Sequence, residues 1–230
     1  MKIHGFQKMT MLDYPEKVAC TVFLAGCNYR CPFCHNALLV TDIDNEQVWQ
    51  EEEILSYLYK RGNLLDGVCI TGGEPLMQPE LEAFIRKIKD LGLAVKLDTN
   101  GTYPDRLRAL IDASLVDYVA MDIKNAKGKY PLTAGVSCAK LSEVEESVSI
   151  LMEGKIPFEF RTTVVKGLHE TTDIAEIGKW IAGAPRYFLQ NFVDSGHLIG
   201  ENMEGYTPEA MAQMLDAVRQ YVPNAQIRGI

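Results

Sequence analysis

The stretch GCNYRCPFCHN, residues 26–36, decides how the rest of the chain is interpreted. Its cysteines, Cys27, Cys31 and Cys34, stand in a C-x3-C-x2-C spacing directly after an apolar run, 18–24, that is typical of a β-strand. Thiolates a few residues apart on a flexible turn can converge on one soft metal centre. Three protein ligands leave one position of such a centre open, whereas a closed structural zinc site takes four. The spacing therefore favours an iron–sulfur cluster with one iron free to bind a small molecule.

The alternative is a four-cysteine zinc site that recruits Cys20, or three unrelated thiols. Cys20 lies inside the apolar run, and a zinc site would more naturally show a second paired C-x2-C. Cys69 lies in another apolar run and is expected to be a core thiol, whereas Cys138 stands alone. His35 is either a metal ligand or a hydrogen-bonding residue of the loop, and we expect the second.

Length and composition are those of a globular protein. The chain has 230 residues, which fits a single domain over 1–230 with a substantial core. Its net charge is -8 and it contains no long lysine–arginine run, so neither nucleic acid nor an anionic membrane is expected as a partner. The amino terminus lacks the apolar core of a signal peptide, and no segment approaches the ~20 apolar residues of a membrane span. Six cysteines, three of them clustered, favour a reducing cytoplasm over a disulfide framework.

Apolar strands alternate with amphipathic helices along the whole chain. After 18–24, strands are expected at 68–71, 93–97, 117–121, 157–165 and 187–192. Helices are expected at 46–61 (with Asp44 or Asn45 as the cap), 79–91, 104–111, 141–152, 172–181 and 208–221. Residues 1–17 are expected to form a short strand or hairpin that covers one end of the fold.

Strand–helix units in series give a parallel sheet with right-handed crossovers. Polar motifs follow nearly every strand at its carboxyl end, where a barrel of the TIM type gathers its active site. About six units are present, fewer than the eight that close a barrel. We therefore expect an α/β fold, an incomplete (β/α)6 TIM-type barrel with parallel strands and one open side, in preference to an open doubly wound sheet.

Two motifs follow strands in the first half of the chain. In GGEP, 72–75, the glycines would let the backbone approach a ligand closely, while Glu74 could accept a hydrogen bond from a cation such as an ammonium group. A glycine pair before Pro75 is also an ordinary turn. DTNG, 98–101, is equally consistent with a tight turn or a helix cap.

Charged residues mark the second half. Asp122 and Lys124 could form a surface ion pair. Arg161 lies inside the apolar strand 158–165, where an unpaired charge would be costly. It either pairs with an acid or reaches the barrel mouth and binds an anion such as a carboxylate.

Together these motifs resemble those of a known superfamily. The C-x3-C-x2-C loop with Phe33 before its last cysteine, followed one strand later by GGEP, resembles the radical S-adenosylmethionine (SAM) superfamily. CHN at 34–36, DTNG and MDIK at 121–124 are similar to the activating enzymes of glycyl radical enzymes. LDYPEKVACTVFLAGCNYRCPFCHN at 12–36 and LQNF at 189–192 most resemble the activating proteins of anaerobic ribonucleoside-triphosphate reductases. The resemblance extends from about residue 5 to residue 192.

The resemblance implies two cofactors. Cys27, Cys31 and Cys34 would hold one 4Fe-4S cluster, and SAM would chelate the fourth iron through its amino and carboxylate groups. The backbone of Phe33 would meet the adenine. The residues expected to meet the methionine amino group are Gly72, Gly73 and Glu74. Those expected around the carboxylate are Lys124 and Arg161, with Asp122 near the ribose.

The resemblance also implies a cation. Asp98 and Thr99 match positions that help bind a monovalent cation in related activators. One departure is that some activators carry a histidine soon after the last strand, where this chain has Asn191, Phe192 and Val193.

The function implied is that of an anaerobic radical oxidoreductase. A flavodoxin- or ferredoxin-type donor would reduce the cluster, SAM would be cleaved reductively, and a hydrogen would be taken from a glycine of a partner enzyme, anaerobic ribonucleoside-triphosphate reductase. No catalytic residue beyond the cluster and SAM is expected. The alternatives are an activase of another glycyl radical enzyme, a small-molecule radical SAM enzyme with, for example, a pterin substrate, and a non-enzymatic zinc or electron-transfer module.

Overall fold

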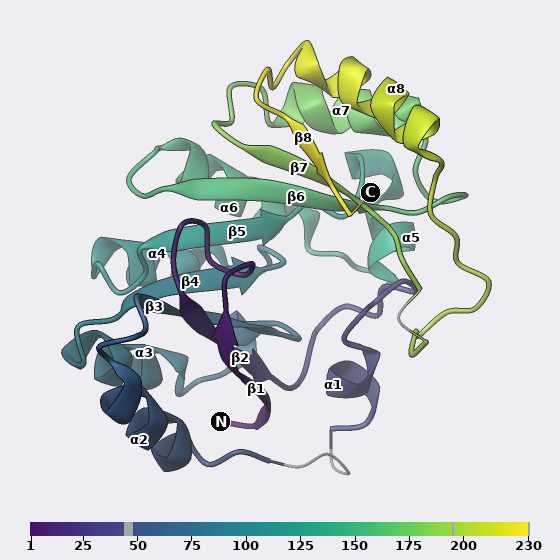
Figure 1. Ribbon diagram of the computed structural model, residues 1–230. Helices are drawn as coiled ribbons and strands as arrows, with labels where there is room; N and C mark the ends of the chain where they lie inside the picture. Colours follow the sequence, from purple (N-terminus) through teal and green to yellow (C-terminus); the bar gives the residue numbers. More distant parts are fainter. Residues whose placement is uncertain (44–47, 195, 230) are drawn as a thin grey trace.

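The computed structural model describes residues 1–43, 48–194 and 196–229 and is built on one curved sheet (Figure 1). Its strands are β1 (Ile3–Thr10), β2 (Ala19–Leu24), β3 (Gly67–Gly72), β4 (Ala94–Thr99), β5 (Tyr118–Asp122), β6 (Phe158–Val164), β7 (Tyr187–Asn191) and β8 (Gln226–Arg228). Its helices are α1 (Ala37–Thr41), α2 (Glu51–Arg61), α3 (Leu81–Asp90), α4 (Pro104–Asp112), α5 (Tyr130–Ala134), α6 (Leu141–Met152), α7 (Thr171–Trp180) and α8 (Pro208–Arg219). Two short 3-10 turns are η1 (Pro75–Met77) and η2 (Lys127–Lys129).

The strands follow one another in the sheet in the order in which they occur in the chain, from β1 to β8. Strands β2 to β8 are parallel, and β1 pairs with β2 antiparallel. A doubly wound sheet would reverse its strand order at a switch point, whereas sequential order with right-handed crossovers places the helices on one face. Within the described ranges no pairing joins β8 to β1, so the barrel is not closed. The predicted incomplete barrel with one open side is confirmed.

The six predicted parallel strands are β2 to β7, and their ends differ from the predicted bounds by at most two residues. The helix predicted at 141–152 is α6, and the last helix ends at Arg219 instead of residue 221. Helix α2 begins at Glu51, where the side chains of Gln50 and Glu53 form a capping box. The predicted start at Glu46 and the predicted caps Asp44 and Asn45 lie outside the described residues.

The remaining elements were predicted loosely, as the strand or hairpin of 1–17 was, or not at all, as in the case of α1, η1, η2, α5 and β8. The segment 1–17 contributes the eight-residue strand β1, which pairs with β2 and leads into the loop before it. Strand β8 has only three residues, too few to show an alternating pattern. The segment 125–137, which lacked a clear pattern, contains η2 and the five-residue helix α5, which ends at Gly135 in the left-handed conformation.

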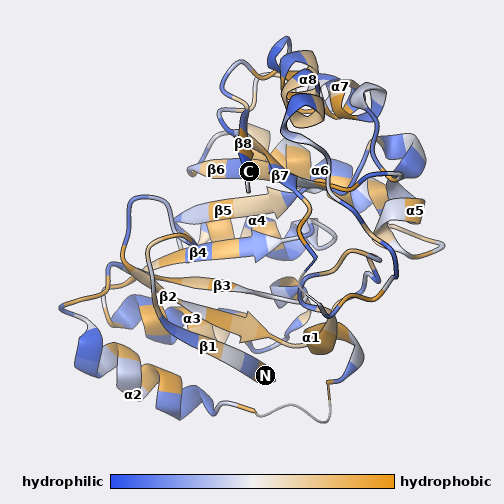
Figure 2. Cartoon of the chain, turned by 45° about the vertical axis from the view of Figure 1, so that its right-hand side comes forward, coloured by the Kyte–Doolittle hydropathy of each residue, from blue (hydrophilic) through white to orange (hydrophobic). Residues whose placement is uncertain are grey.

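Alternate residues of each parallel strand face the two sides of the sheet. On one side, apolar side chains such as Val22, Ile70, Leu97 and Phe160 join the side chains of the helices in one continuous core. Figure 2 shows α2 and α3 beside β2 and β3, and α7 and α8 at the β8 end. No helix of the described residues is long and apolar enough to cross a membrane.

On the inner side a small separate cluster lies at the amino-terminal ends of the strands. It consists of Tyr14, Ala19 and Tyr118, with Ala94 packed against them. Ala19, Ala94 and Tyr118 are the first residues of β2, β4 and β5, and the rings of Tyr14 and Tyr118 lie 6.1 Å apart. Because this end of the barrel is filled, the interior is accessible from the carboxyl ends of the strands.

Candidate active site

One cavity lies at the carboxyl ends of β2 to β7, where the predicted motifs gather. Its lining includes Cys27, Tyr29, Cys31, Phe33, Cys34, His35, Asn36, Val40, Thr71, Gly72, Gly73, Asp98, Thr99, Asn100, Asp122, Lys124, Arg161, Thr163 and Gln190. Cys20 and Cys69 are buried in the strands and Cys138 is exposed, and none of these three lines the cavity. The loop at 26–36 therefore supplies all of the cavity's thiols.

Hydrogen bonds to the backbone hold the loop at 26–36 against the GGEP segment. The Glu74 amide donates to the Gly26 carbonyl at 2.8 Å, and the Asn36 side chain donates to the Gly72 carbonyl at 2.9 Å. A Cβ on Gly73 would lie 2.0 Å from the Gly26 carbonyl oxygen, so no larger residue fits there. Gly72, the last residue of β3, is required for a similar reason, because it has a φ of +121° and a Cβ there would lie 2.3 Å from the Leu24 carbonyl oxygen.

The other side of this loop is held by segments from the second half of the chain. Tyr29 donates its hydroxyl to the Ala139 carbonyl at 2.6 Å, and the amide of Arg30 donates to the Ala134 carbonyl at 2.9 Å. His35 Nε2 donates to the Val193 carbonyl at 2.8 Å, and its ring stacks on a neighbouring phenylalanine, Phe192, at 5.4 Å. His35 is thus a hydrogen-bonding residue of the loop, as expected.

Burial keeps the three thiols of the cavity protonated when no metal is bound. It raises the pKa of Cys27 to about 12 and that of Cys31 to about 11, and it raises the pKa of Cys34 as well. Metal binding replaces these protons, because the thiolate is the ligand. Within residues 1–43, 48–194 and 196–229, no group of three His, Cys, Asp or Glu residues is placed to hold a single metal ion. Three thiols around one cavity, with no fourth cysteine in its wall, fit a cluster that has an open iron.

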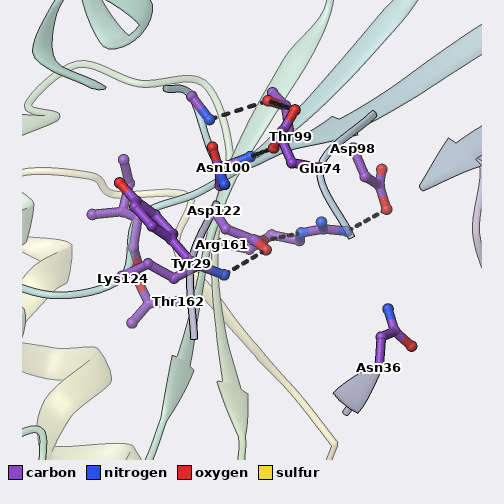
Figure 3. Close-up of polar contacts among 12 residues, drawn as sticks. Tyr29, Asn36, Glu74, Asp98, Thr99, Asn100, Asp122, Lys124, Arg161 and Thr162 are labelled. Atoms are coloured by element: carbon purple, nitrogen blue, oxygen red, sulfur yellow. Dashed lines mark hydrogen bonds and ion pairs between the residues drawn. The ribbon is translucent and has the colours of Figure 1, made fainter. Parts of the chain in front are cut away.

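Glu74 joins the GGEP segment to the DTNG segment. Its Oε1 accepts hydrogen bonds from the Leu76 amide at 3.0 Å and the Thr99 hydroxyl at 2.9 Å, and its Oε2 accepts one from the Asn100 amide at 2.7 Å (Figure 3). The side chain is fully buried behind the cavity wall, whereas Gly72 and Gly73 line the cavity. Burial raises the pKa of Glu74 to about 7, against the three hydrogen bonds that lower it.

Asn100 connects the DTNG segment to the cysteine loop. Its Nδ2 donates to Asn28 Oδ1 at 2.9 Å and lies 3.9 Å from the Cys27 sulfur. The hydroxyl of Thr102 donates to Asn100 Oδ1 at 2.7 Å and accepts from the Asn28 side chain at 3.0 Å. A motif that was equally consistent with a simple turn therefore helps to place the first cysteine.

Five charged side chains form a continuous series of ion pairs, which we call the charged row. Its members are Lys96 and Asp98 of β4, Asp122 of β5, Arg161 of β6 and Lys124, two residues after β5. Lys96 pairs with Asp98, and Asp98 accepts from Arg161 at 3.3 Å. Arg161 donates to Asp122 at 3.0 Å, and Asp122 accepts from Lys124 at 3.0 Å (Figure 3). Thus Arg161 both pairs with acids and lines the cavity.

The charged row holds its members in their ionised forms. Burial alone would raise the pKa values of Asp98 and Asp122, but the positive charge of Arg161 and of the neighbouring lysines outweighs it and lowers both. Burial alone would lower the pKa values of Lys124 and Arg161, yet the adjacent carboxylates raise them. The row therefore places fixed charges of both signs at the cavity.

His169 fixes the backbone that carries Lys124. Its Nδ1 accepts from the Val165 amide at 3.2 Å, so Nε2 carries the proton and donates to the Lys124 carbonyl at 2.8 Å. Burial lowers its pKa. The ring also lies edge-on to Phe33 at 6.3 Å. This histidine had no visible partner in the sequence, because Lys124 lies 45 positions away.

The structure brings together on the cavity wall every residue that the sequence suggested, except Glu74, which lies behind it. The lining residues that sequence reasoning missed are Tyr29, Asn36, Val40, Thr71, Asn100, Thr163 and Gln190. Thr163 could have been found, since it lies two positions after Arg161 on the same face of β6. For the other neutral residues, nothing in the neighbouring sequence indicates that they line a cavity.

Comparisons with known proteins show which sequences and structures this chain is similar to. Residues 21–181 match the model of the radical SAM superfamily. A protein of Methanocaldococcus jannaschii named as a glycyl-radical enzyme activating enzyme is 30% identical over 99% of this chain and 96% of its own length. The pyruvate formate-lyase-activating enzyme of Clostridium pasteurianum is 31% identical over 54% of this chain and 52% of its own length. The solved structure of native anSMEcpe with bound AdoMet shares the fold, with a TM-score of 0.66 and 18% identity over 89% of this chain and 61% of that one.

Proposed function

Because the chain belongs to the radical SAM superfamily, we propose that it is the activating enzyme of a glycyl radical enzyme, and that this partner is an anaerobic ribonucleoside-triphosphate reductase. One observation carries the proposal: the thiols of the 26–36 loop, the GGEP glycines and four of the five side chains of the charged row, all but Lys96, share one cavity at the carboxyl ends of an unclosed barrel. The name of the relative that matches over 99% of the chain, a glycyl-radical enzyme activating enzyme, supports the activase part of the proposal and does not specify the partner.

The thiols of Cys27, Cys31 and Cys34 would hold the 4Fe-4S cluster. Gly72 and Gly73 would present backbone to the ammonium group of SAM, since they line the cavity beside the thiols. Glu74 would act indirectly, because its carboxylate is already used to hold the DTNG segment. The backbone of Phe33 would contact the adenine, since Phe33 lines the same cavity.

The charged row would bind the carboxylate of SAM. It contains three cations, Lys96, Arg161 and Lys124, and two carboxylates, Asp98 and Asp122. One positive charge is left over, which matches the single carboxylate of SAM. Lys124 and Arg161 line the cavity and would make the contact, with Asp122 beside them for the ribose hydroxyls.

When bound, the cluster and SAM would supply one-electron chemistry: with one electron from a flavodoxin- or ferredoxin-type donor and one hydrogen atom from the partner's glycine, SAM would be converted to methionine and 5′-deoxyadenosine, and the glycine would become a glycyl radical. The chain itself binds, orients and shields the reactants.

The surface around the cavity suits a protein substrate. Val193, whose carbonyl accepts from His35, is 61% exposed, and Leu38, in the helix after the 26–36 loop, is 41% exposed. A protein partner that covers the cavity would also cover these two side chains. The unclosed side of the sheet would admit a loop of that protein.

The choice of ribonucleotide reductase rests on sequence similarity at 12–36 and 189–192 and on the cysteines. Activators of other glycyl radical enzymes often carry an insert with further cysteines, whereas here Cys69 is buried in β3 and Cys138 is exposed on its own. A single cluster is therefore expected. A pyruvate formate-lyase partner is the second candidate, because an activating enzyme of that class is 31% identical over about half the chain.

The test is electron paramagnetic resonance (EPR) on anaerobic, reduced holoenzyme mixed with SAM and each candidate partner. We expect a glycyl radical doublet with the ribonucleotide reductase, equal amounts of methionine and 5′-deoxyadenosine, and no doublet when the partner's radical glycine is replaced by alanine. A doublet only with pyruvate formate-lyase would change the partner. Productive SAM cleavage with a small molecule and no protein partner would overturn the activase proposal.

A further inference from the structure

Asp98 has both of its carboxylate oxygens engaged by cations of the chain. Oδ1 accepts from the Lys96 ammonium and Oδ2 accepts from Arg161 Nη1 at 3.3 Å. Thr99 is engaged as well, because its hydroxyl donates to Glu74 at 2.9 Å and accepts from the Gly101 amide at 3.1 Å. The two residues that the family resemblance assigns to a monovalent cation therefore do not fit an additional ion.

Lys96 is unusual among the lysines of this chain because it is only 2% exposed. It lies two positions before Asp98 on β4, so both side chains point to the inner side of the sheet. Its other close contact is the Cys69 sulfur at 3.7 Å, on the neighbouring strand β3. A buried ammonium is costly unless a carboxylate compensates it, and here Asp98 does so.

The charge count shows what Lys96 contributes. Without it, the charged row would hold two cations and two carboxylates. Arg161 would then be the only cation paired with Asp98 in the row. The Lys96 ammonium pairs with Oδ1 of Asp98 and neutralises this carboxylate from the side away from the cavity. The charged row therefore keeps one surplus positive charge at the cavity. The side chain of Lys96 does not line the cavity, so it acts through Asp98 and Arg161.

We propose that the Lys96 ammonium is a built-in replacement for a monovalent cation, a positioning residue that occupies Asp98 and thereby leaves Arg161 free to bind the carboxylate of SAM. This inference rests on the SAM site of the proposed function and is independent of which protein is activated. It identifies Lys96 as the residue that makes SAM binding independent of sodium and potassium.

The experiment measures SAM affinity of the reduced holoenzyme from the shift of its cluster EPR signal, in sodium, potassium or tetramethylammonium salts of equal ionic strength. Wild-type affinity is expected to agree within about twofold in all three salts. In Lys96→Met the affinity should fall by about tenfold or more in tetramethylammonium, since an ion pair partner is lost, and recover when sodium or potassium is added. Rescue by an ion distinguishes a charge role from a packing role.

The matched control is Lys155→Met. Lys155, like Lys96, is a lysine held in ion pairs, here with Asp112 at 2.9 Å and Glu153 at 3.5 Å, but it precedes β6 and so lies at the opposite end of the barrel. The Lys155→Met variant should bind SAM with the affinity of the wild type in every salt.

Three results would overturn the inference: a wild type that loses about tenfold in affinity without small cations, a Lys96→Met variant of unchanged affinity, or one that is equally weak in all salts. If Lys96→Met does not fold, the wild-type comparison alone still decides. A wild type whose EPR signal does not respond to SAM in any salt would instead overturn the SAM site itself.

Discussion

The two faces of the sheet show how one strand can serve stability on one side and chemistry on the other. In β4, Val95 and Leu97 face the helices and belong to the main core, while Lys96 and Asp98 face the interior and form an ion pair. In β6, Phe160 and Arg161 divide in the same way. All of these side chains are mostly removed from water, yet only the inner ones are charged.

The difference follows from what each face can offer a charge. On the outer face a charge would meet mostly apolar side chains and, among the residues that the structure describes, no opposite charge, so the cost of its desolvation would not be compensated. On the inner face the curvature of the sheet brings residues of β4, β5 and β6 within hydrogen-bond distance, so each charge finds a partner. Inside the incomplete barrel, ion pairing therefore compensates the cost of removing these charges from water, provided that each charge keeps its partner.

The largest expected effect separates two buried thiols, Cys31 in the cavity and Cys20 on the outer face of β2. Cys31→Ala should abolish the iron–sulfur cluster and with it all 5′-deoxyadenosine formation. Cys20→Ala should leave iron content unchanged and lower the free energy of unfolding by only about 1 kcal/mol. Iron analysis and the EPR signal of the reduced protein measure both. Loss of metal in Cys20→Ala, with zinc in the wild type, would favour a four-cysteine site instead.

The second effect compares neighbours on β6. Arg161→Met removes the residue that joins Asp98 to Asp122, and SAM affinity should fall by about a hundredfold. Phe160→Ala should lower the free energy of unfolding by about 3–5 kcal/mol and leave SAM affinity of the folded protein unchanged. Calorimetric titration with SAM and urea unfolding distinguish them. Equal losses of affinity in both variants would show that the two faces are not independent.

A third, intermediate effect concerns Glu74, which is buried behind the cavity wall and has a pKa raised from 4.5 to about 7. Below pH 4.5 the carboxyl is protonated in both the folded and the unfolded chain. As the pH rises through about 7, the unfolded chain has already released this proton, so the free energy of unfolding should fall, by on the order of 3 kcal/mol in all.

Glu74→Gln removes this titration and serves as the reference. Urea unfolding of the cluster-free wild type and variant between about pH 5 and 8.5 should show that the free energy of unfolding of the wild type falls relative to that of the variant up to about pH 7, and that the difference is constant above it. Parallel curves would mean that the three hydrogen bonds to Glu74 keep its pKa at an ordinary value.

The smallest effect is expected for a polar pair on the outer face. The Tyr187 hydroxyl donates to the Thr162 hydroxyl at 2.7 Å, and Thr162 donates in turn to the Ile123 carbonyl at 2.8 Å. Tyr187→Phe should lower the free energy of unfolding by about 1 kcal/mol, because Thr162 keeps its second partner. SAM affinity should not change. A measurable loss of SAM affinity would show that residues on the outer face of the sheet also influence the SAM site.

Local patterns were sufficient for much of the fold. Apolar runs located β2 to β7 within two residues, and the spacing of Cys27, Cys31 and Cys34 located the loop that lines the cavity. Strand β8 was missed because three residues show no period, and its Arg228 pairs with the buried Glu159, 69 positions away. A pairing over that separation leaves no trace in either local sequence.

The site was less predictable than the fold. Arg161 was recognisable because a charge inside an apolar strand demands a partner, but the sequence could not say which acid it meets. Lys96 was overlooked within its strand, although it stands two positions from Asp98 on the same face. Glu74 was expected at the ligand, and only the structure shows that its carboxylate is used up by Leu76, Thr99 and Asn100.

The sequence by itself determined the order of strands and helices and the three-cysteine loop, because hydrophobic periodicity and ligand spacing are properties of neighbouring residues. Only the tertiary structure decided which charges meet. Arg161 contacts Asp98 across 63 positions, and the pKa values of both depend on that contact and on their burial. Electrostatic energy depends on distance in space and on the surrounding medium, and a one-dimensional sequence specifies neither until the sheet has curved.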